Sequence, residues 1–134
     1  MDQKLLLRVV TPDRQVVRED VEEIQAPGRE GYLGILPGHA PLLSELKPGE
    51  MTYRQGKGVQ RLAVSGGFLE VLPEQVTVLA ETAERPEDID ITRAQSAKER
   101  AEMRLKSQNP EVDLNRAAVA LQRALIRIQV ASKR

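Results

Sequence analysis

The sequence predicts an α+β protein in two parts, an N-terminal antiparallel β-sandwich followed by a C-terminal α-helical hairpin. Three observations support this fold class. Apolar residues alternate with a period of two before Pro86, turns rich in glycine and proline separate these runs, and the apolar period becomes helical after Pro86. We therefore expect a sandwich over residues 1–85 and a helix-turn-helix over residues 86–134.

Short strands account for the first part of the chain. Apolar alternation marks several of them: Leu5, Leu7 and Val9; Leu62 and Val64; Leu69 and Val71; Val76 and Val78. The turn signals between strands include KPG, QGKG and SGG. Glycine accepts the positive φ of tight turns, so QGKG at 55–58 is expected to close a hairpin. Strands at this spacing are typical of a sandwich or barrel.

Two helical runs of similar length follow. Their apolar stripes consist mostly of alanine: Ala94, Ala97, Ala101 and Leu105, then Leu114, Ala117, Ala118, Leu121, Ala124, Leu125 and Ile128. Pro110 separates the runs because proline cannot continue a helix, and Asp113 is expected to cap the second run. An alanine stripe lets two helices approach closely but buries little apolar area. The pattern therefore predicts an αα-hairpin that can open.

Charge is unevenly distributed along the chain. Residues 1–89 carry 10 basic and 15 acidic side chains, whereas residues 90–134 carry 10 basic and 5 acidic ones. The first helix carries Arg93, Arg100 and Arg104, and the second carries Arg116, Arg123 and Arg127 at the same spacing. These arginines form either a solvated surface or a site for an anion or acidic protein, because guanidinium groups bind phosphate and carboxylate bidentately.

The composition argues against several classes of protein. The chain has no cysteine and one histidine, which argues against thiolate chemistry and a His/Cys metal cluster, and no G-x-S-x-G motif is present. No apolar run approaches the roughly 18 residues of a membrane span, and the N-terminus does not resemble a signal peptide. We expect a soluble intracellular protein that has no transmembrane segment and binds no nucleic acid, since the helices lack aromatic residues.

One stretch carries a resemblance to a known family. Residues 31–49, GYLGILPGHAPLLSELKPG, resemble the signature of the epsilon subunit of rotary F-type ATP synthases, as does AVSGGFLEV at 63–71. The resemblance implies a non-catalytic central-stalk rotor subunit that couples proton translocation to ATP synthesis. Its sandwich would bind the gamma subunit and the c-ring, as a peripheral protein on the cytoplasmic face of the bacterial cell membrane.

The resemblance also implies roles for individual residues of the sandwich. His39 is expected to be a packed or hydrogen-bonded turn residue, because PGHAPLL is structural in the family. Tyr32, Gly38 and His39 are assigned to contact with gamma or the c-ring. Many family members have an acidic residue where this chain has Tyr32. No catalytic residue, catalytic cofactor or metal site is expected.

The hairpin is expected to be regulatory. By resemblance, it permits turnover when folded down on the sandwich, and it blocks ATP hydrolysis when extended toward the alpha–beta catalytic head. Residues 89–94, IDITRA, match the I/L-D-x-x-R-A motif of epsilon subunits that bind ATP. The resemblance assigns ATP, with or without Mg²⁺, to eight residues: Glu84, Ile89, Asp90, Arg93, Ala94, Arg100, Arg123 and Arg127.

Two alternatives remain open for these residues. Asp90 would only cap the first helix if no nucleotide binds, and Arg93 would pair with Asp90 or Glu87. In that case the hairpin is an interaction module whose basic surface docks on acidic surface of the catalytic head. The joint presence of the acidic residues and the arginines favours ATP, which would bridge both helices and stabilise the folded-down state.

Overall fold

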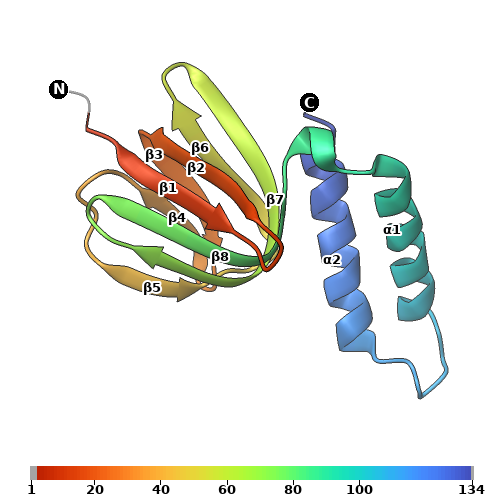
Figure 1. Cartoon of the computed structure of the whole chain (residues 1–134). Coiled ribbons are helices and arrows are strands. Elements are labelled where there is room, and N and C mark those ends of the chain that lie inside the picture. Colours follow the sequence, from red (N-terminus) through yellow and green to blue (C-terminus); the bar gives the residue numbers. More distant parts are fainter. Residues whose placement is uncertain (1–2, 134) are drawn as a thin grey trace. The chain divides into compact units, whose positions relative to one another are not determined.

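The computed structural model describes residues 3–133, which form strands followed by helices (Figure 1). The strands are β1 Leu5–Val10, β2 Gln15–Val21, β3 Glu23–Gly28, β4 Gly31–Ile35, β5 Leu42–Glu45, β6 Gly49–Gln55, β7 Gly58–Val71 and β8 Gln75–Glu84. The helices are the short 3-10 helix η1 Pro86–Asp88, α1 Ile91–Leu105 and α2 Leu114–Ala131. The chain forms two compact units, Met1–Glu84 and Arg85–Arg134. The predicted fold class is confirmed.

The strands of the first unit are hydrogen-bonded in the order β2-β1-β8-β7-β6-β3-β4. The pairs are antiparallel except for β1 and β8, which are parallel. β7 is the longest strand, with 14 residues, and its two halves have different partners. Its first half pairs with β6 and its second half with β5, so one strand belongs to both layers of the sandwich.

A glycine pair allows β7 to change layers. Gly66 and Gly67 have φ values of +68° and +97°, which side chains with a Cβ rarely adopt. The predicted turn at SGG is therefore a bend within a continuous strand. Gly67 lies opposite Ala80 of β8, where a Cβ would come within 1.8 Å of the carbonyl oxygen of Leu79. The bend thus depends on the absence of a side chain at this position.

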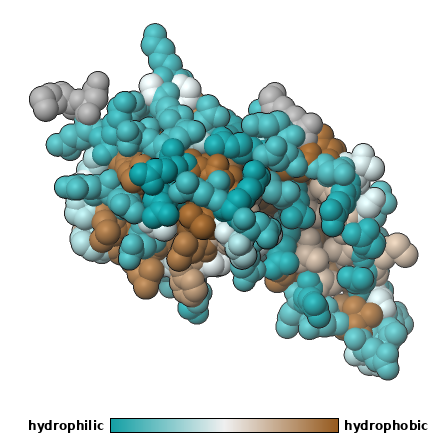
Figure 2. Space-filling model, viewed as in Figure 1, coloured by the Kyte–Doolittle hydropathy of each residue, from teal (hydrophilic) through white to brown (hydrophobic). Residues whose placement is uncertain are grey.

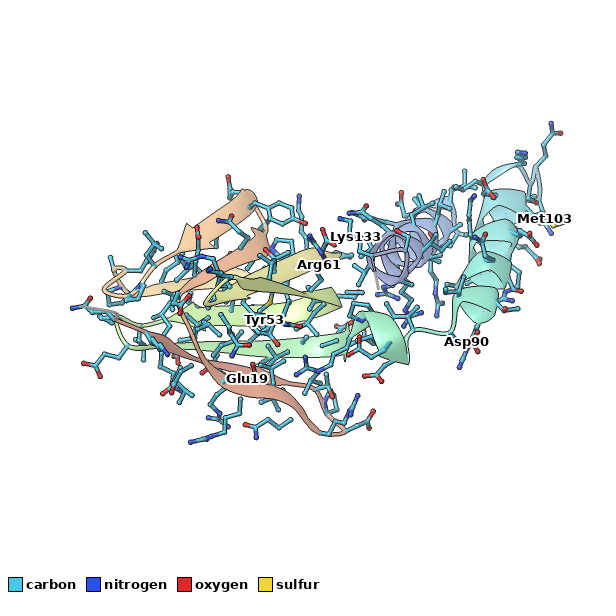
Figure 3. The ribbon with its side chains drawn as sticks, turned by 90° about the horizontal axis from the view of Figure 1, so that it is seen from above. Glu19, Tyr53, Arg61, Asp90, Met103 and Lys133 are labelled. Carbon is cyan, nitrogen blue, oxygen red and sulfur yellow. The ribbon has the colours of Figure 1, made fainter. Side chains whose placement is uncertain are left out.

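The core of the sandwich is aliphatic, as the composition indicates. The alternating residues of the strands, such as Leu5, Leu7 and Val9, are fully buried. Tyr53 is the largest fully buried side chain and lies among the strands (Figure 3). Every member of this apolar cluster belongs to the first unit. The sandwich therefore contains a complete hydrophobic core of its own.

A hydrogen bond and an ion pair hold the β6–β7 turn in place. The turn contains only Gly56 and Lys57, and Gly56 has a φ of +60°, as expected for glycine at the first position of such a turn. The Glu22 carboxylate accepts a hydrogen bond from Gly56 N–H at 2.8 Å and forms an ion pair with Arg54 at 3.0 Å. These contacts tie the turn to the junction between β2 and β3.

The hairpin is built around a seam of five buried alanines, at intervals of seven within each helix: Ala94 and Ala101 in α1, and Ala117, Ala124 and Ala131 in α2. The helices lie side by side and run antiparallel (Figure 1). The sequence predicted a wider stripe, but Leu105, Leu114 and Leu125 are exposed. Alanine at every second turn brings the helix axes together, and larger side chains are displaced from the contact.

We expect a shortened chain ending at Arg85 to fold. Its apolar cluster is complete without the hairpin, so it should bury its core and melt cooperatively. Thermal melting followed by β-sheet circular dichroism measures this. A shortened chain that shows no cooperative transition would contradict the independence of the sandwich.

Candidate functional site

The residues of the IDITRA segment divide into two groups. Asp90 caps α1, and its Oδ1 accepts a hydrogen bond from the N–H of Arg93 at 3.0 Å. Ile89 and Ala94 are buried, whereas Asp90 and the side chain of Arg93 are exposed. The apolar positions therefore fix the start of the helix, and the charged positions face solvent.

The helix cap accounts for Asp90 but not for Arg93. The guanidinium of Arg93 forms no ion pair among residues 3–133, so the alternative of pairing with Asp90 or Glu87 is wrong for this structure. The side chain of Arg100, two turns further along α1, is also exposed and without an ion pair in that range. Both groups can receive an anion without losing an existing partner.

The packing of the hairpin brings the predicted arginines to one face. Arg93 and Arg100 each precede a seam alanine by one residue on α1, and Arg123 does so on α2. In an antiparallel pair of right-handed helices, the positions just before the seam residues lie on the same side of the seam. Arg127, three residues after Ala124, is half-buried and also lies on this side.

By the same geometry, Arg104 and Arg116 belong to this side of the hairpin. We call the resulting surface the arginine face, and its members are Arg93, Arg100, Arg104, Arg116, Arg123 and Arg127. Glu84 is the last residue of β8, opposite Ala63, and belongs to the other unit. The structure thus places the arginines of the predicted ATP site on one side of the hairpin, and the place of Glu84 beside them stays a prediction.

Tyr32 connects two strands of the sandwich. Its hydroxyl donates to the carbonyl oxygen of Glu50 at 2.8 Å and accepts from the N–H of Glu50 at 3.2 Å. The ladder between β3 and β6 ends at Gln25, and Pro27, which lies opposite Tyr32 in β4, has no N–H to donate. The phenol therefore satisfies backbone groups that β3 leaves unpaired.

The environment of Tyr32 favours the neutral phenol. Partial burial raises the pKa of Tyr32 above its usual value; the hydrogen bond with the Glu50 backbone opposes this, and the Glu50 carboxylate reinforces it. Tyr32 is still 58% exposed. A partner that contacts this part of the sandwich would therefore meet an aromatic ring held in a fixed position.

We expect Tyr32→Phe to lower the stability of the sandwich by about 0.5–1.5 kcal/mol at neutral pH, because the Glu50 backbone loses a partner. The folded-state pKa of Tyr32 is raised, so its contribution is complete below the unfolded pKa of about 10 and is lost as the pH rises further. Denaturant unfolding of both proteins at neutral and alkaline pH measures this. A stability difference that does not shrink at alkaline pH would contradict it.

Pro37 and Gly38 form a turn between β4 and β5, and the N–H of His39 closes it by donating to the carbonyl oxygen of Leu36 at 3.1 Å. Gly38 has a φ of +85°, and its N–H donates to the carbonyl oxygen of Pro73 at 2.8 Å. His39 is half-buried, and its Nδ1 lies 2.7 Å from the carbonyl oxygen of Ala40, so this nitrogen carries the proton. His39 is thus a hydrogen-bonded turn residue, and its contact with a partner stays a prediction.

The sandwich also has an apolar depression that the sequence did not predict. A cavity of about 420 Å³ lies between the β3–β4 turn, β5 and β7, and exposed Leu43 and Phe68 line it. Arg29 and Glu45, also part of the lining, form an ion pair at 3.4 Å. Figure 2 shows hydrophobic residues among hydrophilic ones on the visible face of the sandwich. The sequence feature that could have indicated this depression is the chain's one phenylalanine, Phe68, in SGGFLEV.

Two kinds of feature are absent from the described residues. Within residues 3–133, no helix is both long and apolar enough to cross a membrane. The same residues contain no group of three or more histidine, cysteine, aspartate or glutamate side chains placed to hold a metal ion.

Comparison with known proteins identifies the family. Residues 4–86 match the beta-sandwich domain of the ATP synthase Delta/Epsilon chain, and residues 87–132 match its long alpha-helix domain. The chain is 48% identical to the ATP synthase epsilon chain of Syntrophobacter fumaroxidans over 99% of both chains. It is 52% identical to that of Nitratidesulfovibrio vulgaris over 97% of both.

Solved structures have the same fold. A chain of the Euglena gracilis mitochondrial ATP synthase, in a structure that includes the c-ring, matches 98% of this chain with a TM-score of 0.82 and 25% identity; 82% of that chain is covered. A chain from the central stalk and c-ring of the Tetrahymena thermophila enzyme matches with a TM-score of 0.58 and 19% identity, covering 98% and 96% of the two chains. The protein therefore belongs to the family of ATP synthase epsilon chains, as a non-catalytic subunit of the central stalk.

Proposed function

We propose that this subunit transmits rotation in a bacterial ATP synthase and regulates ATP hydrolysis through its hairpin. The sandwich would bind the gamma subunit and the c-ring on the cytoplasmic face of the cell membrane. Its exposed Tyr32, the turn at Gly38 and His39, and the apolar depression at Phe68 supply surface for such contacts. The solved relatives belong to assemblies that contain a c-ring, which supports this assignment.

The arginine face carries the regulatory part of the proposal. ATP, with or without Mg²⁺, would bind across both helices, with its phosphates on Arg93, Arg100, Arg123 and Arg127. Asp90 and Glu84 would accept hydrogen bonds from the adenine amino group or the ribose. ATP held by both helices adds contacts that the alanine seam lacks, so it favours the folded-down, non-inhibitory state. It acts as a regulatory ligand, and the subunit itself performs no chemistry.

The same charge supports a second candidate function. Residues 90–134 carry 10 basic and 5 acidic side chains, and an extended basic helix can pair with carboxylates of the catalytic head. In this case the hairpin inhibits hydrolysis without binding nucleotide. Both candidates place the inhibitory contact on the helices, and they differ in the response of the hairpin to ATP.

Removal of the hairpin from the assembled enzyme tests the regulatory role. We expect a complex whose epsilon chain ends at Asp88 to hydrolyse ATP faster than the intact complex, since the inhibitory helices are gone. A complex with Arg14→Ala, a change in the sandwich, should keep the intact rate. Equal rates for the shortened and intact complexes would show that the hairpin does not restrain hydrolysis.

A further inference from the structure

The two helices of the hairpin carry the same pattern twice. Residues 89–94 are IDITRA and residues 112–117 are VDLNRA, so the D-x-x-R-A segment recurs after 23 positions. The repeat extends along each helix, because two more arginines follow at seven and eleven residues after the first. The matching sets are Asp90, Arg93, Ala94, Arg100 and Arg104, and Asp113, Arg116, Ala117, Arg123 and Arg127.

The two copies have the same local structure. Asp113 caps α2 as Asp90 caps α1, and each Oδ1 accepts a hydrogen bond at 3.0 Å from the backbone N–H of the arginine three residues later. The alanine after each arginine is buried in the seam. The equivalence therefore extends from the sequence to the cap and the packing of each helix.

Because the helices are antiparallel, the two copies of the pattern combine into two equivalent places on the hairpin. Each place takes residues from both helices. A half-turn about an axis perpendicular to the hairpin exchanges α1 with α2, so the start of each helix lies beside the second half of the other. Asp90 and Met103 lie at opposite ends of α1 (Figure 3). The first place combines Asp90 and Arg93 with the late arginines of α2, and it is the proposed ATP site. The second place combines Asp113 and Arg116 with Arg104 of α1.

A cavity occupies the second place. It has a volume of about 460 Å³ and lies at the loop end of the hairpin; we call it the tip cleft. Its lining residues are Arg104, Glu111, Val112, Asp113, Arg116 and Ala117. All except Glu111 have a counterpart in the proposed ATP site: Arg127, Ile89, Asp90, Arg93 and Ala94. The volume is within the range of small-ligand sites.

The charges in the tip cleft suit a phosphorylated ligand. Arg104 and Arg116 come from different helices, are exposed and form no ion pair within the described range 3–133. The carboxylate of Asp113 already accepts the capping hydrogen bond, and Glu111 lies on the loop. Two guanidinium groups from different helices can bind one polyphosphate, and carboxylates can accept hydrogen bonds from the ribose or the base of a nucleotide.

We propose that the tip cleft is a second, weaker nucleoside-triphosphate site, with the phosphates held by Arg104 and Arg116. This inference rests on the proposed ATP site, to which the tip cleft is related by the internal repeat. It is weaker because Val112 is half-exposed where Ile89 is buried, so the cleft is less enclosed. A nucleotide there bridges the end of α1 and the start of α2, and it stabilises the loop end of the hairpin.

Calorimetric titration of the full chain with ATP tests this, with Arg93→Gln and Arg116→Gln as matched variants. Glutamine has a helix propensity close to that of arginine and removes the charge while keeping a polar side chain. We expect two classes of site in the wild type. Arg116→Gln, and likewise Arg104→Gln, should remove the weaker class and leave the tighter one. Arg93→Gln should weaken the tighter class about tenfold or more and leave the weaker one. Arg14→Gln is the control.

The other outcomes separate the two proposals. One nucleotide per chain, with an isotherm that Arg116→Gln and Arg104→Gln leave unchanged, overturns the tip cleft and leaves the first site intact. Loss of binding in Arg116→Gln but not in Arg93→Gln overturns the first site and supports the tip cleft. Titration with inorganic triphosphate distinguishes a nucleotide site from a site that binds any polyphosphate. The inference expects inorganic triphosphate to bind more weakly than ATP, and equal binding by the wild type and Arg116→Gln overturns it.

Discussion

Replacement of Gly67 by alanine is expected to destabilise the sandwich by about 3 kcal/mol or more. The added Cβ would lie 1.8 Å from the carbonyl oxygen of Leu79 and 3.0 Å from the Cα of Ala80. Both contacts are with backbone that is paired to β7, so neither can move without breaking the sheet. The φ of +97° adds strain of its own.

Thermal melting measures this effect, with Gly58→Ala as the matched control in the same strand. Gly58 has no positive φ, and a Cβ there would only be in ordinary contact, at 3.5 Å from the carbonyl oxygen of Gln55. For a domain of this size we expect Gly67→Ala to lower Tm by roughly 12–24 °C. We expect Gly58→Ala to shift it little. Similar melting temperatures for the two variants would contradict the role of the bend.

Replacement of Arg93 by alanine is expected to lower the affinity for ATP about tenfold to a hundredfold. A hydrogen bond to a charged group is worth roughly 1.5–3 kcal/mol, and each 1.4 kcal/mol changes the affinity tenfold. Arg93 is suited to this test because its guanidinium forms no ion pair among the described residues. Its removal should therefore leave the fold intact, which helical circular dichroism can verify.

Arg14→Ala is the control, since Arg14 lies in the sandwich, outside the predicted ATP site. Titration calorimetry of the wild type and both variants gives the comparison. We expect Arg14→Ala to bind ATP as the wild type does. Equal losses of affinity in Arg93→Ala and Arg14→Ala would indicate that ATP binding depends on the overall charge of the chain and not on the arginine face.

The fold class was predictable because each part of the chain has a uniform apolar period. The period of two buries Leu5, Leu7 and Val9, and the helical period places Ala94 and Ala101 in the seam. The layer change within β7 was not predictable, since SGG is compatible with either a turn or a bent strand. Only the pairing of β7 with both β5 and β6 distinguishes them.

The arginines of the hairpin were predictable from the sequence, whereas the contacts of Tyr32 in the sandwich were not. The arginine spacing and the Asp113 cap follow from local sequence, so the arginine face could be anticipated. The hydrogen bonds between Tyr32 and Glu50 join residues 18 positions apart, and they depend on the missing N–H of Pro27 in a third strand. Such a contact is set by strand register, which the local pattern does not specify.

Thermal melting of the hairpin with and without ATP tests the central claim, which is that nucleotide stabilises the folded hairpin. Helical circular dichroism of the full chain follows the transition, and the chain ending at Asp88 provides the control. A ligand that binds only the folded form adds about 2.7 kcal/mol at a hundredfold excess over Kd. We predict that ATP raises the helical melting temperature, that ADP raises it less, and that ATP leaves the shortened chain unchanged. A helical transition that millimolar ATP does not move would contradict the account.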